Sequence, residues 1–88
     1  MNQNKWWYVY VLQSTKNNGW YIGSTNNYKK RISTHNQRKN KATKPYVPWK
    51  LIYLEVSLNI EDARAREKYL KSGMGRRYLK NRMKFFFA

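Results

Sequence analysis

Two runs of β-branched and aromatic residues, separated by a short polar segment, constrain the fold of this chain more than any other feature. Trp6–Ser14 and Trp20–Ser24 both have the composition of β-strands. Thr15–Gly19 lies between them and has the Asn and Gly residues that tight turns require. The two runs therefore predict a β-hairpin close to the N-terminus.

The register of this hairpin decides which side chains share a face. The sequence alone leaves several registers open; with a loop over residues 15–18, Tyr21 lies opposite Leu12 and Gly23 lies opposite Tyr10. Side chains alternate between the two faces of a strand. In this register one face is apolar and carries Val9, Val11, Trp20 and Ile22. The other face carries the phenol hydroxyls, with Tyr8, Tyr10, Leu12 and Tyr21.

The middle of the chain predicts a helix, a loop and a third strand. Candidate N-cap residues precede a short helix over Tyr28–Asn36. Gln37–Lys44 is polar and basic and is predicted to be a loop. Pro45 and Pro48 favour an extended approach to a strand over Trp49–Val56, since a residue before proline avoids the helical region.

The C-terminal third predicts two helices. Asn59 caps the first of them, and Gly73 is a typical C-terminal stop. Gly75–Lys84 is then a short basic helix. The order β-β-α-β-α-α predicts an α+β fold, with a small three-stranded sheet flanked by helices. The 88 residues are enough for a single domain, with a core over about 7–80 and a basic and aromatic tail over 81–88. Phe85–Phe87 in this tail either packs over the sheet or stacks on unpaired bases.

The charge balance points to a polyanionic partner. Lys and Arg number 19 against 4 Asp and Glu, which gives a formal net charge of +15 at pH 7. So much positive charge repels itself in a compact state unless a polyanion binds. The aromatic content of 17% is typical of a folded domain and not of a basic disordered tail.

Composition also excludes several kinds of site. The chain has no Cys and one His, which excludes a disulfide framework, a thiolate zinc site and a cysteine nucleophile. No targeting signal and no membrane-spanning segment is recognisable. We therefore expect a cytoplasmic protein without a membrane partner.

The basic residues concentrate in two segments. Both segments predict contacts with a phosphate backbone, which depend on salt and carry no sequence information. A solvated surface without a partner is the alternative. The first helix and the loop after it carry Lys29, Lys30, Arg38, Lys39, Lys41 and Lys44, and the last helix carries Arg76 and Arg77.

Glu67 breaks the pattern of its helix. At helical spacing it falls within an apolar stripe formed by Ile60, Ala63, Leu70 and Met74. A carboxylate among core positions is costly unless it is paired or binds a metal. One interpretation is an ion pair with Arg64 or Lys71, one turn away. The other is a single-carboxylate site for a hard cation such as Mg²⁺.

Arg31 and His35 are the corresponding exceptions in the first helix, where they share a face with Tyr28 and Ile32. An inward arginine can clamp a phosphate or stabilise developing negative charge. Alternatively, its stem packs on the sheet with the guanidinium in water. A lone histidine is more often a surface or structural residue than a catalytic one.

Several motifs in order resemble the GIY-YIG endonuclease superfamily, of which small stand-alone bacterial members are known. Tyr8-Val9-Tyr10 and Tyr21-Ile22-Gly23 are similar to its paired motif. Ser24–Asn36 resembles the segment after that motif, and Pro48–Glu55 resembles the third strand. Ala63–Gly73 resembles the metal-site helix. The resemblance covers roughly residues 7–80.

The resemblance implies cleavage of a phosphodiester with one Mg²⁺ or Mn²⁺ in the active site. Glu67 would hold the metal, and Arg31 would stabilise charge on the phosphoryl group. Tyr10 would activate the attacking water, with Tyr21 assisting by hydrogen bonding and His35 bonding a tyrosine hydroxyl or shuttling its proton. A phenol has a pKa near 10, so Tyr10 would need the positive field of the metal and Arg31. Gly23 would allow backbone or nucleic acid to approach closely.

We therefore expect a metal-dependent DNA endonuclease without sequence specificity. Single-stranded, branched or damaged DNA is the expected substrate, with a targeting protein as a candidate partner, because the chain has no recognisable targeting domain. One alternative is a catalytically silent nucleic-acid-binding module of the same fold. Another is a basic RNA-associated protein, which gives no reason for Glu67 on the apolar stripe.

Overall fold

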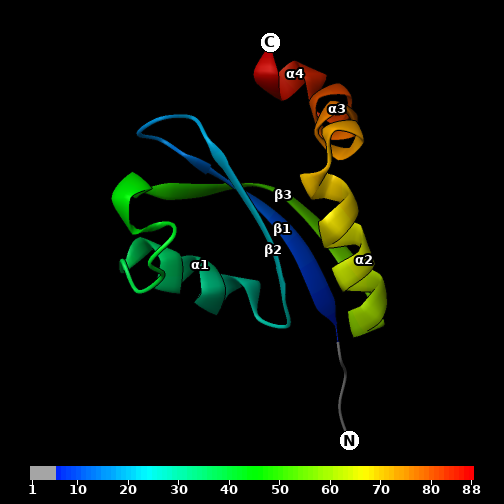
Figure 1. Ribbon diagram of the computed structural model, residues 1–88, viewed down its shortest axis with the longest axis horizontal. Helices are drawn as coiled ribbons and strands as arrows, with labels where there is room; N and C mark the ends of the chain where they lie inside the picture. The colour runs from blue at the N-terminus through cyan, green and yellow to red at the C-terminus, as the bar shows by residue number, and fades with distance from the viewer. Residues whose placement is uncertain (1–5) are drawn as a thin grey trace, which may run out of the picture.

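A computed structural model describes residues 6–88 and contains a three-stranded antiparallel sheet with helices on both faces (Figure 1). The strands are β1 (Trp7–Ser14), β2 (Trp20–Thr25) and β3 (Trp49–Ser57), in the order β2-β1-β3. The predicted α+β class and element order are confirmed. Residues 1–5, the first part of the predicted single domain, lie outside the described residues. No helix in the described part of the chain is both long and apolar enough to cross a membrane.

The hairpin has the register that places Tyr10 opposite Gly23 and Leu12 opposite Tyr21. β1 is the central strand and also pairs with β3, with an irregularity between Val11 and Leu12. A central strand is hydrogen-bonded along both edges, so Tyr10 stands on the most constrained backbone of the sheet.

Each face of the sheet has its own core. On one face Val9, Val11 and Ile22 pack with residues of α2 (Ile60–Lys71) and α3 (Gly73–Arg82). The other face carries Tyr10, Leu12 and Trp49 and packs against α1 (Tyr28–Asn36). The predicted apolar face is confirmed, and the phenol-bearing face is also a buried one, with Tyr10 and Leu12 fully buried.

The helix α1 occupies the predicted range. Asn27 is its N-cap, and its side-chain oxygen accepts a hydrogen bond from the backbone N–H of Lys30 at 3.1 Å. The predicted loop ends in a 3₁₀ turn over Lys44–Tyr46, where an extended approach was expected at Pro45, and the chain then passes through a cis Val47–Pro48 bond into β3. This connection brings Thr43 back beneath α1, where its side chain is buried.

The junction between the last helices differs from the prediction. The helix α2 ends at Lys71, and Ser72 serves both as its C-cap and as the N-cap of α3. The Ser72 hydroxyl accepts the N–H of Gly75, so the chain re-enters a helix at once and Gly73 begins α3 instead of stopping α2. Met74 therefore leaves the apolar stripe and is 64% exposed.

Gly75 is the glycine that this junction requires. A Cβ on Gly75 would lie 2.1 Å from the carbonyl oxygen of Tyr69 and 2.5 Å from the Cα of Leu70. The α3 backbone thus touches the α2 backbone directly. A further short helix, α4 (Lys84–Phe87), follows α3 and lies near the β1–β2 turn, where Phe87 stacks on Trp20 (Figure 1).

Candidate active site

A hydrogen-bonded chain joins the central strand to α1 and the loop after it. The Tyr10 hydroxyl lies 3.2 Å from Nε2 of His35, and Nδ1 of His35 lies 2.8 Å from Oγ1 of Thr43. The Thr43 hydroxyl donates to the carbonyl of Asn40 at 3.4 Å. It must then accept from Nδ1–H, which leaves Nε2 as the acceptor of the Tyr10 proton. All three side chains of the Tyr10–His35–Thr43 chain are buried.

Burial keeps the Tyr10 and His35 side chains of this hydrogen-bonded series uncharged. Burial and the neighbouring Tyr21 raise the pKa of Tyr10 to about 12, although the charge and hydrogen bond of Arg31 oppose them. Burial, and then the charge of Arg31, lower the pKa of His35 below its ordinary 6.5. At neutral pH Tyr10 is therefore a phenol and His35 a neutral imidazole. Arg31 acts in the expected direction, but its field alone does not lower the pKa of Tyr10.

Tyr21 packs beside the same pair. Its ring centroid lies 4.8 Å from that of His35 and 6.4 Å from that of Tyr10. Tyr21 is half-buried and Arg31 is exposed, so both present surface to solvent where Tyr10 has none. The structure therefore brings Tyr10, Tyr21, Arg31 and His35 together at one place between the sheet and α1.

Gly23 provides the space for the Tyr10 ring. A Cβ at this position would lie 2.5 Å from Oη and 2.7 Å from Cζ of Tyr10. The absence of a side chain at Gly23 thus allows the Tyr10 phenol to lie close to the β2 backbone. The contact with nucleic acid predicted for Gly23 stays a prediction.

Glu67 lies across β2 from this group, where its charge contributes to the raised pKa of Tyr10. Its Oε1 accepts from the Ser24 hydroxyl at 2.6 Å, and its Oε2 accepts from Nζ of Lys71 at 2.7 Å. Of the two ion pairs expected from the sequence, Lys71 forms one in this structure. The Glu67 side chain keeps 21% exposure and that of Lys71 keeps 54%. The ammonium is thus the more easily displaced of the two groups.

The donor set around Glu67 suits a hard cation. A carboxylate and a hydroxyl supply oxygen ligands, and Mg²⁺ is typically held by one or two carboxylates together with waters and substrate phosphates. The described residues contain no group of three or more His, Cys, Asp and Glu side chains that could hold a metal alone. Among the residues described, a divalent cation at Glu67 would therefore depend on water and phosphate for its remaining ligands.

Sequence reasoning missed two residues of this site. Ser24 ends the second predicted strand and had no role in the site assigned to it, but it bonds Glu67, 43 positions away. Thr43 stood in a loop without any assigned role, but it fixes the His35 ring. A signal for Ser24 existed, because it directly follows the Tyr21–Gly23 motif. For Thr43 the sequence offered none.

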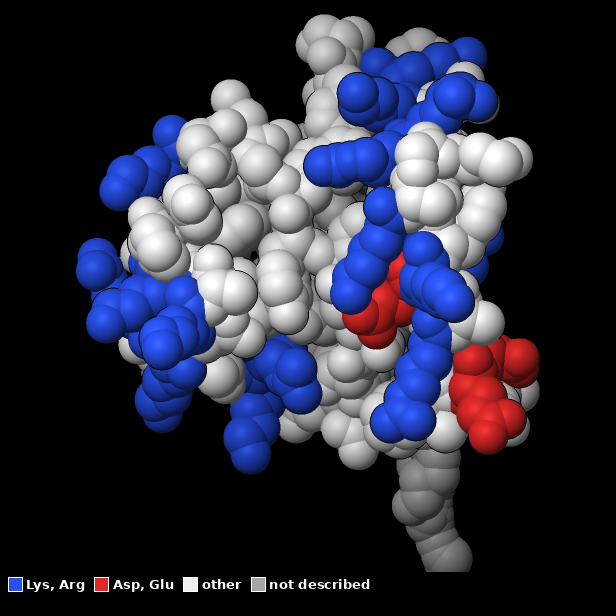
Figure 2. Space-filling view, in the orientation of Figure 1, with Lys and Arg blue, Asp and Glu red and all other residues white. Residues whose placement is uncertain are grey.

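The predicted nucleic-acid-binding cations lie on the surface. Lys29 and Lys30 are exposed on α1, and Arg76 and Arg77 are exposed on α3. The loop after α1 exposes the remaining cations, which are Arg38, Lys39, Lys41 and Lys44. Figure 2 shows Lys and Arg side chains on the α1 side of the molecule and over α2 and α3, with a largely uncharged surface between them. The two groups thus lie on either side of this largely uncharged surface.

The fold and this arrangement together are those expected of a small catalytic domain of the nuclease type. A family model described as the GIY-YIG catalytic domain matches residues 6–84, and the chain belongs to this family. Membership points to nuclease-type activity on a nucleic acid substrate. No solved structure matches the chain significantly.

The relatives with similar sequences are bacterial proteins of unassigned function. A UPF0213 protein of Clostridium perfringens is 43% identical over 65 residues, which cover 73% of this chain and 69% of the relative. The UPF0213 protein YazA of Bacillus subtilis is 40% identical over 65 residues, 73% of this chain and 65% of the relative. The matched part of the chain thus spans about two thirds of the length of these relatives.

Proposed function

We propose that the protein is a divalent-metal-dependent endonuclease that hydrolyses DNA phosphodiester bonds. The observation that carries the proposal is the meeting of Tyr10, Tyr21, Arg31, His35 and Glu67 from four different elements. A purely structural core has no need for a buried phenol–imidazole pair beside an arginine and a carboxylate. Titratable groups with shifted pKa values that converge in one place are typical of catalytic sites.

Tyr10 and His35 supply a path for one proton. Because the pKa of Tyr10 is raised to about 12, Tyr10 is protonated at neutral pH and is not itself a ready base. It can take a proton from the attacking water only as its own proton moves to Nε2 of His35, which lies 3.2 Å away. Thr43 holds the imidazole in the tautomer that can accept this proton. Tyr10 has no exposed surface in this structure, so the proposal requires that its hydroxyl become accessible when substrate binds.

Arg31 and Tyr21 act on the phosphate. The exposed Arg31 guanidinium can donate to the phosphoryl oxygens and stabilise the charge that develops on them. The Tyr21 hydroxyl orients the phosphate or the water by hydrogen bonding. These two side chains are the first that a substrate meets, because they carry the exposed surface of the group.

Glu67 is the proposed ligand of a single Mg²⁺ or Mn²⁺. When bound, such a cation supplies Lewis-acid stabilisation of the phosphodiester and its leaving group. The Ser24 hydroxyl orients one carboxylate oxygen of Glu67 at 2.6 Å. Lys71 pairs with the other oxygen and would have to give it up to the metal.

The substrate we propose is single-stranded, branched or damaged DNA, reached with or without a targeting protein. The exposed cations on α1, the following loop and α3 would hold the phosphate backbone on both sides of the site. A catalytically silent nucleic-acid-binding module is the second candidate. It is favoured by the Lys71–Glu67 ion pair and by the complete burial of Tyr10.

Cleavage by Glu67→Ala and wild-type protein separates the two candidates. The assay uses supercoiled, single-stranded and branched DNA, and RNA, with Mg²⁺, Mn²⁺ or EDTA. We expect metal-dependent cleavage by the wild type, complete loss in Glu67→Ala, and DNA binding that is largely retained. Glu61→Ala is the matched control, since Glu61 is an exposed carboxylate in the first turn of the same helix. Cleavage retained in Glu67→Ala would refute the metal assignment, and binding without cleavage on every substrate would establish the silent module.

A further inference from the structure

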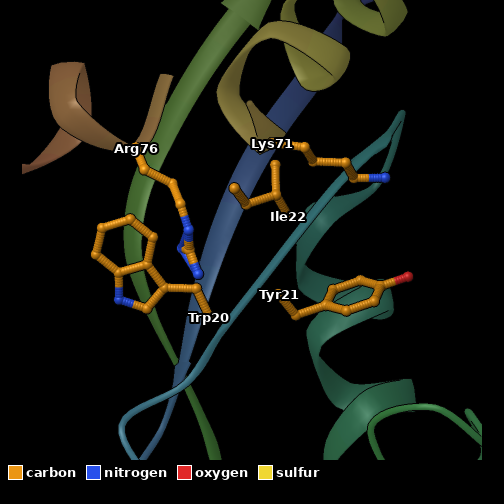
Figure 3. A pocket seen from close by; sticks show the side chains of 5 residues that line it. All are labelled: Trp20, Tyr21, Ile22, Lys71 and Arg76. Atoms are coloured by element: carbon orange, nitrogen blue, oxygen red, sulfur yellow. The ribbon is translucent and has the colours of Figure 1, made fainter. Parts of the chain in front are cut away.

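A groove leads away from the candidate active site along β2. Two adjoining pockets of about 230 and 380 Å³ form this groove, and Trp20 and Arg76 line both of them. Tyr21 and Lys71 line the first pocket, so the groove begins beside the residues that surround Glu67. Lys80 and Phe87 line the second pocket. Figure 3 shows Arg76 reaching from α3 toward the Trp20 indole, with Tyr21 and Lys71 extending to the opposite side of the view.

The Trp20 ring at the centre of this groove already holds a planar partner. Phe87 stacks on it with a centroid distance of 5.6 Å and an interplanar angle of 25°. The Arg76 guanidinium lies 4.9 Å from the centroid of the same ring. Phe87 comes from the four-residue helix α4 and is 37% exposed. The stacking position on Trp20 is therefore filled by a side chain from a short element at the surface.

We propose that the Trp20 ring is a stacking subsite for one unpaired nucleobase of the substrate strand, and that this base replaces the Phe87 ring there. The inference rests on the proposed nuclease function, because the groove takes its direction from that site. An aromatic ring flanked by cations is the chemistry that binds single strands: bases stack on the ring and the cations follow the phosphates. Here Lys71, Arg76 and Lys80 line the groove on either side of Trp20.

The subsite gives the protein a means to prefer unpaired DNA. A base inside a duplex is paired and stacked on its neighbours, and it reaches Trp20 only if it is first extruded at a cost. A base in a single strand or flap does not pay that cost. The groove therefore selects strands that are unpaired next to the scissile phosphate, while the exposed cations bind single and double strands alike.

Two substitutions with effects of opposite sign test the proposal. Binding of a labelled thymidine oligomer is measured by fluorescence anisotropy in EDTA, so that no strand is cut. We expect Trp20→Leu to weaken binding by at least about fivefold. Fivefold is the lower end of the usual range for loss of one base–aromatic stack. Phe87→Ala should strengthen binding by about 2- to 10-fold. It removes the ring that competes with the base for Trp20, and the size follows from the usual stability of one aromatic pair.

Matched controls separate stacking from general damage. Trp7→Leu alters another half-buried tryptophan packed on the same core, and Phe85→Ala alters an exposed ring in α4. Neither should change binding. An abasic oligomer with the same number of phosphates should bind Trp20→Leu and wild type equally. Three results would each overturn the proposal. The first is an equal loss of binding in Trp20→Leu and Trp7→Leu. The second is a loss in Trp20→Leu that is as large on the abasic oligomer as on the thymidine oligomer, and the third is weaker or unchanged binding by Phe87→Ala.

A second variant keeps the test valid if Trp20→Leu does not fold, which circular dichroism reports. Arg76→Gln should weaken binding of the thymidine oligomer more than Arg82→Gln, which removes an equal charge from the same helix outside the groove. Equal effects would overturn the proposal. Binding in EDTA does not depend on catalysis. If neither wild type nor any variant cleaves, the nuclease function is refuted, but the binding results still decide whether the stacking subsite exists.

Discussion

Gly23→Ala tests whether the packing of Tyr10 against β2 holds the site together. The added Cβ would lie 2.5 Å from the Tyr10 hydroxyl oxygen, where ordinary contact begins at 3.4 Å. The phenol must therefore move by about 0.9 Å, but it is fully buried and bonded to His35. Overpacking of this kind typically costs about 1–3 kcal/mol. For a domain of this size that loss corresponds to a fall of roughly 5–20 °C in Tm.

A double-mutant cycle identifies the cause of that loss. Tyr10→Phe removes the oxygen atom that makes the shortest contact, so it should relieve part of the cost of Gly23→Ala. Urea unfolding followed by circular dichroism should show a coupling of about 0.5–2 kcal/mol between the two changes. Gly19→Ala is the control, because its Cβ would meet only the exposed Asn17 side chain, at 3.1 Å. Additive effects, or a Gly23→Ala protein as stable as wild type, would refute the packing argument.

Two further predictions concern His35 and Gly75. Because the pKa of His35 is lowered in the folded protein, the unfolded chain takes up its proton first as the pH falls. The stability tied to neutral His35 is thus complete above pH 6.5 and is lost below it, toward the lower folded-state pKa. Melting temperatures measured from pH 7 to pH 5 should fall in wild type and fall less in His35→Gln; equal slopes would contradict the buried neutral imidazole. Gly75→Ala should cost about 3 kcal/mol in urea unfolding, since its Cβ meets α2 backbone that cannot rotate away, whereas Gly73→Ala should cost nothing.

The local pattern of the sequence was enough to predict the hairpin. Its two faces follow only once a loop over residues 15–18 is assumed, because the sequence left several registers open. The structure has the register of that loop, with Tyr10 opposite Gly23, and burial separates the two faces as expected for it. Glu67 was recognisable from local pattern as a candidate functional residue, because a carboxylate at a core position of a helix is costly unless it is paired or binds a metal. Local rules succeed where the competing interactions lie within a few residues.

The sequence was less informative where a contact depends on distant parts of the chain. Gly73 is an ordinary helix stop by propensity, but the Ser72 hydroxyl bonds the N–H of Gly75 and starts a new helix there. The raised pKa of Tyr10 follows from complete burial, which no pattern of neighbours revealed. The Thr43 contact with His35 depends on how the loop after α1 folds back.

The parts of the candidate site lie far apart in the sequence, and this separation determines at what point of synthesis the site can form. Ser24 and Glu67, which share one hydrogen bond, are 43 positions apart, and α2 is made after the whole sheet. During synthesis the strands and α1 emerge first and hold tyrosines, arginine and histidine without the carboxylate. Under the proposed function, a growing or truncated chain of this kind lacks the metal ligand and cleaves no nucleic acid. The proposed activity therefore requires that α2 has been made and that Glu67 has reached Ser24.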